Sequence, residues 1–411
     1  MKNNWQEVKL DNVCELIAGF AFKSKDFGAY PDKVVKITNI EPPFVNMTNL
    51  VGVDLSKYNR NNLAKFIVKR GDYVLAMTGA TIGKLGRISN DDIAYINQRV
   101  LKFKPNDGVD KDFLFFILSE SNFSQYILNH IDSESAQANI SAKTIGQYEF
   151  ELPPLDAQKR ISAVLGSLDN KIELNNKINQ NLEAQAQAIF KSWFVDFEPF
   201  KNGKFIDSEL GKIPEGWRVE RLGAVCECVL GGTPSRSRKE YWEGNIPWIN
   251  SGKTNEFRVI SPSEFISAEG LKKSATKLLP KKTTILAITG ATLGQVSLLE
   301  IDACANQSVV GILENNLLPY EYIYMYVSHN IEKIISHQTG GAQQHINKDN
   351  IKNFHIILPP QCELKRYTNA VENLYSEITN LVFQSRRLSQ LRDTLLPKLM
   401  SGEIDVSDVA V

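Results

Sequence analysis

The sequence contains the same pattern of residues twice, and this repeat limits the architectures open to a chain of 411 residues. Repeated segments in the same order predict two similar structural units. Matching residues are 212 positions apart early in the copies and 206 apart at their ends, which indicates a duplication with short loop deletions. The matches are Trp5 with Trp217, Gly19 with Gly231, Ile37 with Ile249, Lys69-Arg70 with Lys281-Lys282, residues 78–83 with 289–294, Asn97-Gln98 with Asn306-Gln307, and the Leu-Pro-Pro motifs at 152–154 and 358–360.

Each copy begins with a region of mixed helix and strand. Residues 34–37, 73–76 and 100–103 are short β-rich runs bounded by Gly, Pro, Asn or Asp, which predicts strands. Residues 113–128, and their counterparts 320–335, are better suited to a helix. We therefore expect one globular α/β domain in each copy.

A heptad pattern follows the Leu-Pro-Pro motif of each copy. Apolar residues step alternately by four and three over residues 161–193 and again over 367–399, which predicts two long helices. The prolines end the preceding strand and prepare the start of the helix. We expect the helices to pair as an antiparallel coiled coil, with Asn175, Asn179 and Ser385 disfavouring slipped pairing. The alternative is that each helix packs only on its own domain.

The predicted fold class is α+β, with two globular α/β domains that are related by a pseudo-twofold internal repeat and separated by the two helices. The expected boundaries are 1–154 for the first domain, 155–198 for the first helix, 199–358 for a linker and the second domain, and 359–411 for the second helix and a tail. A helix over 161–193 is about 50 Å long, which equals roughly 15 base pairs of B-DNA.

The motifs that suggest catalysis all fail in detail. Residues 79–85 resemble a phosphate-binding loop, but their spacing is Gly-x3-Gly-Lys, whereas the motif requires Gly-x4-Gly-Lys. In addition, Leu85 replaces the Ser or Thr that would hold magnesium. Glu41 opens a Glu-Pro-Pro-Phe segment, where amino-group methyltransferases need Asn or Asp. The histidines have no metal-binding spacing, and Cys226-x-Cys228 is not a zinc motif. We therefore expect no catalytic residue, no metal site and no cofactor bound by this chain.

Composition places few limits on partners. The formal net charge is zero, so positive charge for binding nucleic acid would be either local or supplied mostly by a partner chain. Local basic stretches occur at Arg236, Arg238 and Lys239, and at Lys272, Lys273, Lys277, Lys281 and Lys282. An odd cysteine count, no visible secretory signal and no apolar run long enough for a membrane predict a cytoplasmic chain without membrane contact.

The copies share glycines, threonines and Asn-Gln but differ in polar loops. When the two copies are aligned, residues 24–26 correspond to 236–238, and residues 135–139 correspond to 341–345. A shared scaffold with different polar loops suits two readers of different base sequences, and Gln can pair bidentately with adenine. The candidate DNA-binding residues are Lys23, Ser24, Lys25, Gln137, Arg236, Ser237, Arg238, Lys239, Gln343, Gln344 and His345.

The second copy contains a series of short motifs in a fixed order. They are Gly-Gly-Thr-Pro-Ser at 231–235, Tyr241-Trp242, Ile-Pro-Trp-Ile at 246–249, Gly-Ala-Thr-Leu-Gly at 290–294, Asn306-Gln307, Ala-Gln-Gln-His-Ile-Asn at 342–347 and Leu-Pro-Pro at 358–360. The first copy carries weaker versions, with Gly-Phe-Ala-Phe-Lys-Ser at 19–24 and no Trp at Lys36. In these motifs and their order the chain resembles the specificity subunits of type I restriction–modification systems.

The resemblance implies two target-recognition domains, each binding one half of a bipartite asymmetric site in double-stranded DNA. The helices would then set the spacer and dock two modification (methyltransferase) subunits. Those subunits and the restriction (motor-nuclease) subunits would carry S-adenosylmethionine, ATP and magnesium. The alternatives are a methyltransferase, for which the cofactor turn and the Asn-Pro-Pro-Tyr motif are missing, and a coiled-coil adaptor that does not touch DNA.

Overall fold

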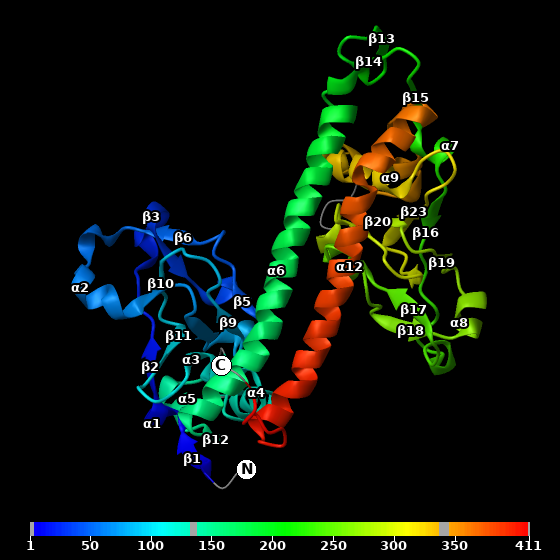
Figure 1. Ribbon diagram of the computed structural model, residues 1–411. Coiled ribbons are helices and arrows are strands. Elements are labelled where there is room, and N and C mark those ends of the chain that lie inside the picture. The colour runs from blue at the N-terminus through cyan, green and yellow to red at the C-terminus, as the bar shows by residue number, and fades with distance from the viewer. Residues whose placement is uncertain (1–3, 132–137, 337–344, 410–411) are drawn as a thin grey trace. The chain divides into compact units, whose positions relative to one another are not determined.

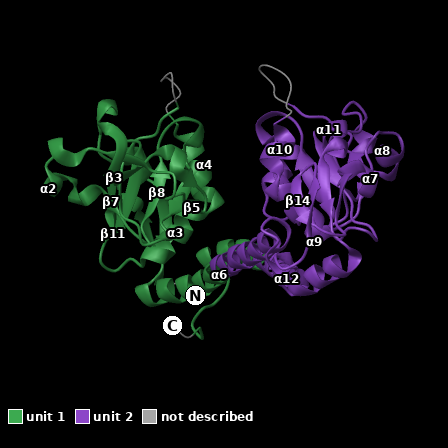
Figure 2. Ribbon diagram, turned by 90° about the horizontal axis from the view of Figure 1, so that it is seen from above, with its two compact units in different colours: residues 1–171, 388–411 green, residues 172–387 purple. Residues whose placement is uncertain are grey.

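The computed structural model describes residues 4–131, 138–336 and 345–409. Contacts divide the chain into two compact units, shown in Figure 2. Unit 1 is Met1–Lys171 with Leu388–Val411, and unit 2 is Ile172–Arg387. Each unit therefore contains one globular domain and a part of each long helix. This division differs from the four-part division predicted from the sequence, because it passes through the helices instead of following their ends.

The two long helices are equal in length. Helices α6 (Leu155–Phe194) and α12 (Gln361–Met400) each have 40 residues, about 60 Å at 1.5 Å per residue. Each begins directly after a Pro-Pro pair, which follows strand β12 (Glu149–Leu152) or β24 (His355–Leu358). Every heptad position predicted over 161–193 and 367–399 is buried or half-buried, so the heptad prediction is confirmed.

Within each unit the two helices run antiparallel (Figure 1). In unit 1, Arg392 on α12 donates to Asp169 on α6 at 2.7 Å. In unit 2, the Asn175 amide donates to Gln384 at 2.8 Å and to Ser385 at 3.2 Å. The expected polar residues therefore lie in the seam between the helices. The alternative, in which each helix packs only on its own domain, is wrong.

The domain of unit 1 is built on two sheets. Helices α3 (Lys111–Ser119) and α4 (Ser121–Asn129) share a hydrophobic core with the larger sheet. The larger sheet has the order β2-β11-β8-β9-β5-β4, and the smaller has β6-β3-β10-β7. The strands are β2 (Cys14–Ala18), β3 (Phe27–Val35), β4 (Ile40–Glu41), β5 (Phe44–Val45), β6 (Val51–Val53), β7 (Ile67–Val68), β8 (Tyr73–Ala76), β9 (Leu85–Arg87), β10 (Ala94–Ile96) and β11 (Val100–Pro105). Strand β1 (Gln6–Lys9) pairs with β12, and the short helices are α1 (Leu10–Val13), α2 (Arg60–Leu63) and α5 (Ala142–Gly146).

The domain of unit 2 repeats this plan. Its sheets have the orders β16-β23-β20-β21 and β18-β17-β22-β19, which match β2-β11-β8-β9 and β6-β3-β10-β7. The strands are β16 (Cys228–Leu230), β17 (Ile246–Ile249), β18 (Glu264–Ile266), β19 (Leu278–Leu279), β20 (Thr284–Ala287), β21 (Val296–Leu298), β22 (Ala303–Ala305) and β23 (Val309–Ile312). Strand β15 (Arg218–Arg221) pairs with β24, a hairpin of β13 (Phe205–Ser208) and β14 (Gly211–Pro214) precedes it, and the helices are α7 (Leu222–Val225), α8 (Ala268–Lys272), α9 (Tyr320–His329), α10 (Ile331–Ile335) and α11 (Lys348–Asn353). The internal repeat and the α+β class are confirmed.

The strand pairing corrects two details of the sequence alignment. Ile96 pairs with Val35, whereas the equivalent Ala305 pairs with Ile249, so the counterpart of Ile249 is Val35 and not Ile37. Lys282 takes the position of Gly71, one residue from the expected match, because both have left-handed backbone, with φ of 68° and 82°. The loops between the strands differ in length between the two copies. At these positions single identical residues were aligned, so the alignment was displaced by one or two residues.

The helical segment that follows β11 and its counterpart after β23 are each interrupted once. Residues 113–128 are helical as predicted, except that Glu120 is extended, with ψ of 154°, and separates α3 from α4. Asn330, with φ of −100° and ψ of 12°, separates α9 from α10 without becoming extended. Both partners of each pair bury apolar side chains, so the hydrophobic pattern continues through the break. In the described ranges, no helix is long and apolar enough to cross a membrane.

Candidate nucleic-acid interface

In unit 1 the motifs shared by the two copies lie side by side. Thr78 forms a bridge with Asn139, and the Met77 N–H donates to the carbonyl of Arg99 at 3.0 Å. The Arg99 guanidinium also lies 3.4 Å from the Thr78 hydroxyl. These residues, with Gln98, line an open hollow of about 510 Å³. The Thr-Gly-Ala-Thr loop, the Asn-Gln turn and the segment after α4 therefore form one surface.

Unit 2 builds the same arrangement. Thr289 forms a bridge with His345, and the Ile288 N–H donates to the carbonyl of Ser308 at 2.9 Å. A shared glycine explains part of this conservation between copies, since a Cβ on Gly231 would lie 2.1 Å from the carbonyl oxygen of Asn306. Gly19 has the same relation to Asn97 in unit 1, at 2.2 Å. The shared residues thus build the scaffold of the surface.

The Gly-Gly-Thr-Pro-Ser loop of unit 2 is anchored by two tryptophans. The Trp248 indole N–H donates to the carbonyl of Gly232 at 3.1 Å, and that of Trp242 donates to the carbonyl of Ser235 at 3.3 Å. The Thr233 hydroxyl also donates to the side chain of Gln307. This loop therefore reaches the Asn-Gln turn and adjoins the surface described above.

Arg236, a candidate DNA contact, already has partners inside its domain. Its guanidinium makes two hydrogen bonds to Glu264, at 2.6 and 2.7 Å, and lies 3.5 Å from the centre of the Trp242 ring. The shared hydrogen bonds raise the pKa of Arg236 and lower the pKa of Glu264. A phosphate or base edge would have to compete with this carboxylate, so the DNA contact of Arg236 remains a prediction.

The two basic stretches of unit 2 come together around α8. The Ser267 N–H, at the start of α8, donates to the carbonyl of Tyr241 at 2.9 Å, so the turn at residues 239–241 lies against the start of α8. We call Arg238, Lys239, Lys272 and Lys273 the α8 basic patch. All four are exposed. Arg238 pairs with Glu240 at 3.3 Å, whereas the three lysines have no ion pair among the described residues.

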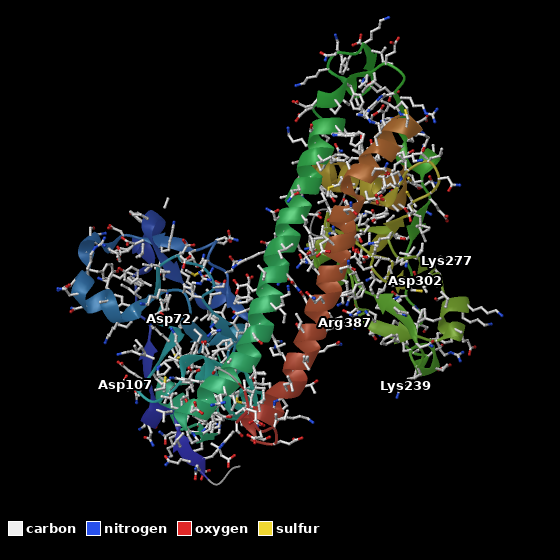
Figure 3. All side chains as sticks on the ribbon, in the orientation of Figure 1. Asp72, Asp107, Lys239, Lys277, Asp302 and Arg387 are labelled. Carbon is white, nitrogen blue, oxygen red and sulfur yellow. The ribbon has the colours of Figure 1, made fainter. Side chains whose placement is uncertain are left out.

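Lys277 is also exposed and lies on the same unit as Lys239 (Figure 3). Lys282, by contrast, is half-buried and binds Glu300, so the sequence grouped it wrongly with the exposed lysines. The candidate Ser237 is exposed, and its hydroxyl lies 2.8 Å from that of Ser235.

The candidates Lys23, Ser24 and Lys25 of unit 1 are exposed at a tightly held turn. The Lys23 N–H donates to the Tyr58 hydroxyl, which in turn donates to the buried carboxylate of Asp26 at 2.5 Å. The Tyr58 hydrogen bond holds the pKa of Asp26 below its usual value. The backbone is thus fixed while the two lysine side chains extend into solvent.

Three candidates, Gln137, Gln343 and Gln344, lie outside the described residues. Arg99, which is not among the residues predicted from the sequence, lines the hollow of unit 1. The sequence contains a signal for this residue. Both copies share the Asn-Gln turn, but the next residue is Arg99 in one copy and Ser308 in the other.

Two of the motifs that suggested catalysis or metal binding have a well-defined local structure. Residues 79–85 form a 3-10 turn, η6 (Gly79–Thr81), that leads into strand β9, whereas a phosphate-binding loop would open a helix. Burial raises the pKa of Cys226 to about 12, which disfavours a thiolate ligand or nucleophile. In the part of the chain that the structure describes, no three His, Cys, Asp or Glu side chains gather as metal ligands would.

Two copies of one α/β domain that present the same surface with different side chains define a tandem recognition protein. The sequence profile of the type I restriction modification DNA specificity domain matches residues 2–184 and 214–382. The chain therefore belongs to the type I restriction modification DNA specificity family.

Similar proteins agree with this membership. The MjaIX specificity subunit of Methanocaldococcus jannaschii is 31% identical over 76% of this chain and 73% of its own. The HindI specificity subunit of Haemophilus influenzae is 24% identical over 98% of this chain and 100% of its own. A crystal structure of an S subunit from M. genitalium has the same fold, with a TM-score of 0.57 and 16% identity over 96% of both chains.

Proposed function

We propose that this chain is the DNA sequence-specificity subunit of a type I restriction–modification complex, in which each domain reads one half of a bipartite asymmetric site. The observation that carries the proposal is the pair of equivalent surfaces with different side chains. Arg99 in unit 1 corresponds to Ser308 in unit 2, and Asn139 corresponds to His345. Equal scaffolds with different donors and acceptors suit direct readout of different bases.

We further propose that the chain is a non-catalytic subunit that acts in the cytoplasm. Two modification subunits would dock on the helices, and restriction subunits would join them; S-adenosylmethionine, ATP and magnesium would bind to these partners. The two equal helices α6 and α12 support two equivalent docking sites, and the specificity subunits among the relatives support a role in a larger enzyme.

A footprint of the complex with its modification subunits tests the proposed function. We expect two short protected segments separated by a spacer in which base changes have no effect on affinity. The half-sites can be found first by mapping methylated adenines in a host that carries the genes. One continuous footprint would contradict the bipartite site, and the absence of any sequence-dependent footprint would favour the coiled-coil adaptor that does not touch DNA.

Arg99 should determine one base of the half-site read by unit 1. Arginine to guanine is the commonest specific base contact, and loss of such a pair costs about 1–3 kcal/mol. We expect Arg99→Ser to relax discrimination at one position while the other half-site stays unchanged, as measured by methylated-motif mapping. Ser308→Ala, at the equivalent position in unit 2, is the matched control and should leave the half-site read by unit 1 unchanged. An unchanged motif in the Arg99 variant would contradict the assignment.

A further inference from the structure

A buried ion pair joins the domain of unit 2 to helix α6. The side chain of Arg258 is fully buried and donates to Glu183 on α6 at 2.7 Å. The Tyr324 hydroxyl, on α9, lies 2.9 Å from the other oxygen of Glu183 and 3.1 Å from Arg258. Glu183 is thus held by two groups of the domain at once.

A second set of contacts joins the same domain to helix α12. Lys282 binds the buried carboxylate of Glu300 at 2.6 Å and the Thr379 hydroxyl on α12 at 2.9 Å. Thr379 also lies 3.2 Å from Glu300, and Arg258 lies 3.9 Å from it. The two sets therefore form one network. We call Glu183, Arg258, Lys282, Glu300, Tyr324 and Thr379 the helix clamp.

The charged contacts of the helix clamp are better suited to fixing the angle of the domain on the helices than to strengthening its attachment to them. Removing charges from water is costly, and a well-packed apolar cluster often stabilises a protein as much as a buried ion pair does. Charged hydrogen bonds, however, have strict distances and angles. A domain held to two helices by several such bonds has one favoured angle, whereas apolar contacts alone tolerate small rotations.

The helix clamp belongs to one repeat only. At the spacing of 206 residues found in the helices, the counterpart of Glu183 is Ser389 and that of Thr379 is Glu173. Glu173 instead pairs with Lys177 on its own helix at 2.5 Å. The first copy therefore does not carry the acid and the hydroxyl that anchor the second domain.

We propose that the helix clamp fixes the angle of the second recognition domain on α6 and α12, and thereby determines which spacer length between half-sites is accepted. This inference rests on the proposed function. Its residues are positioning residues, since none of them lies on the shared surface of the Thr-Gly-Ala-Thr loop. A rotation of the domain at its helix contact would move its base-reading loops along or around the duplex.

The test uses the complex with its modification subunits and a set of duplexes that differ only in spacer length, from two base pairs below the native spacing to two above. The variant is Arg258→Met with Glu183→Leu, which removes both charges and leaves neither buried alone. We expect the preference for native spacing over a one-base-pair change to fall at least threefold. Glu173→Leu with Lys177→Met removes a more exposed ion pair from the same helix and should keep the wild-type profile.

Each outcome is decisive. A clamp variant that folds and keeps the wild-type spacer profile overturns the proposal, even if its overall affinity falls. If the double variant does not fold, Glu183→Gln retains the shape and weakens the pair; it should broaden the profile, and an unchanged profile again overturns the proposal. Wild-type complex that shows no dependence on spacer length would instead count against the proposed bipartite function.

Discussion

Replacing Phe194 by alanine should lower the free energy of unfolding of unit 2 by about 3–5 kcal/mol, because it removes a large aromatic ring from a core that cannot easily collapse. Phe194 is 2% exposed near the end of α6. Its ring centre lies 4.8 Å from that of Tyr322, 4.9 Å from that of Tyr367 on α12, and 5.8 Å from that of Trp217. One side chain therefore connects both helices to the domain.

Urea unfolding followed by tryptophan fluorescence measures this loss, since Trp217 is in direct contact with the site. Leu174→Ala is the matched control on the same helix, because Leu174 is 50% exposed; it should change the free energy by less than about 0.5 kcal/mol. A loss below about 1 kcal/mol for Phe194→Ala would show that the aromatic cluster does not hold the domain on the helices.

The long helices were predictable because their signal is local and periodic. The heptad steps and the Pro-Pro pairs located the start of α6 at Leu155, and the polar seam residues were found where Asn175 and Ser385 meet. The breaks at Glu120 and Asn330 gave no such signal, since apolar residues continue on both sides. The apolar pattern therefore predicted that these segments are helical, but it did not predict where each helix is interrupted.

The candidate site was predictable as a set of loops but not as a set of contacts. Arg236 and Glu264 are 28 residues apart, so the sequence showed an arginine without its carboxylate partner. Arg258 and Glu183 are 75 residues apart, and no local pattern connects them. Interactions between distant segments depend on the folded topology, which the repeat predicts only for the scaffold that both copies share.

Reversing two charges of the α8 basic patch should weaken DNA binding by about ten- to a hundredfold at physiological salt. Lys239 and Lys273 are exposed and have no ion pair in the described ranges, so each is available to a phosphate. Each phosphate contact contributes about −0.9 to the slope of log affinity against log salt concentration. The variant Lys239→Glu with Lys273→Glu should therefore lose about 2 from this slope, as measured by salt titration of the assembled complex on its own site.

The control must separate a phosphate contact from a change in total charge. Lys204 and Lys212 are exposed on and beside the β13–β14 hairpin of the same unit, and Lys204→Glu with Lys212→Glu changes the net charge equally. Because screening over about 8–10 Å limits long-range effects at physiological salt, this control should keep the wild-type slope. Equal losses in both variants would mean that the patch acts only through overall charge. An unchanged slope in the patch variant would place the phosphate contacts of unit 2 elsewhere. The base recognition by the loops of unit 2 is measured separately, by the methylated motif.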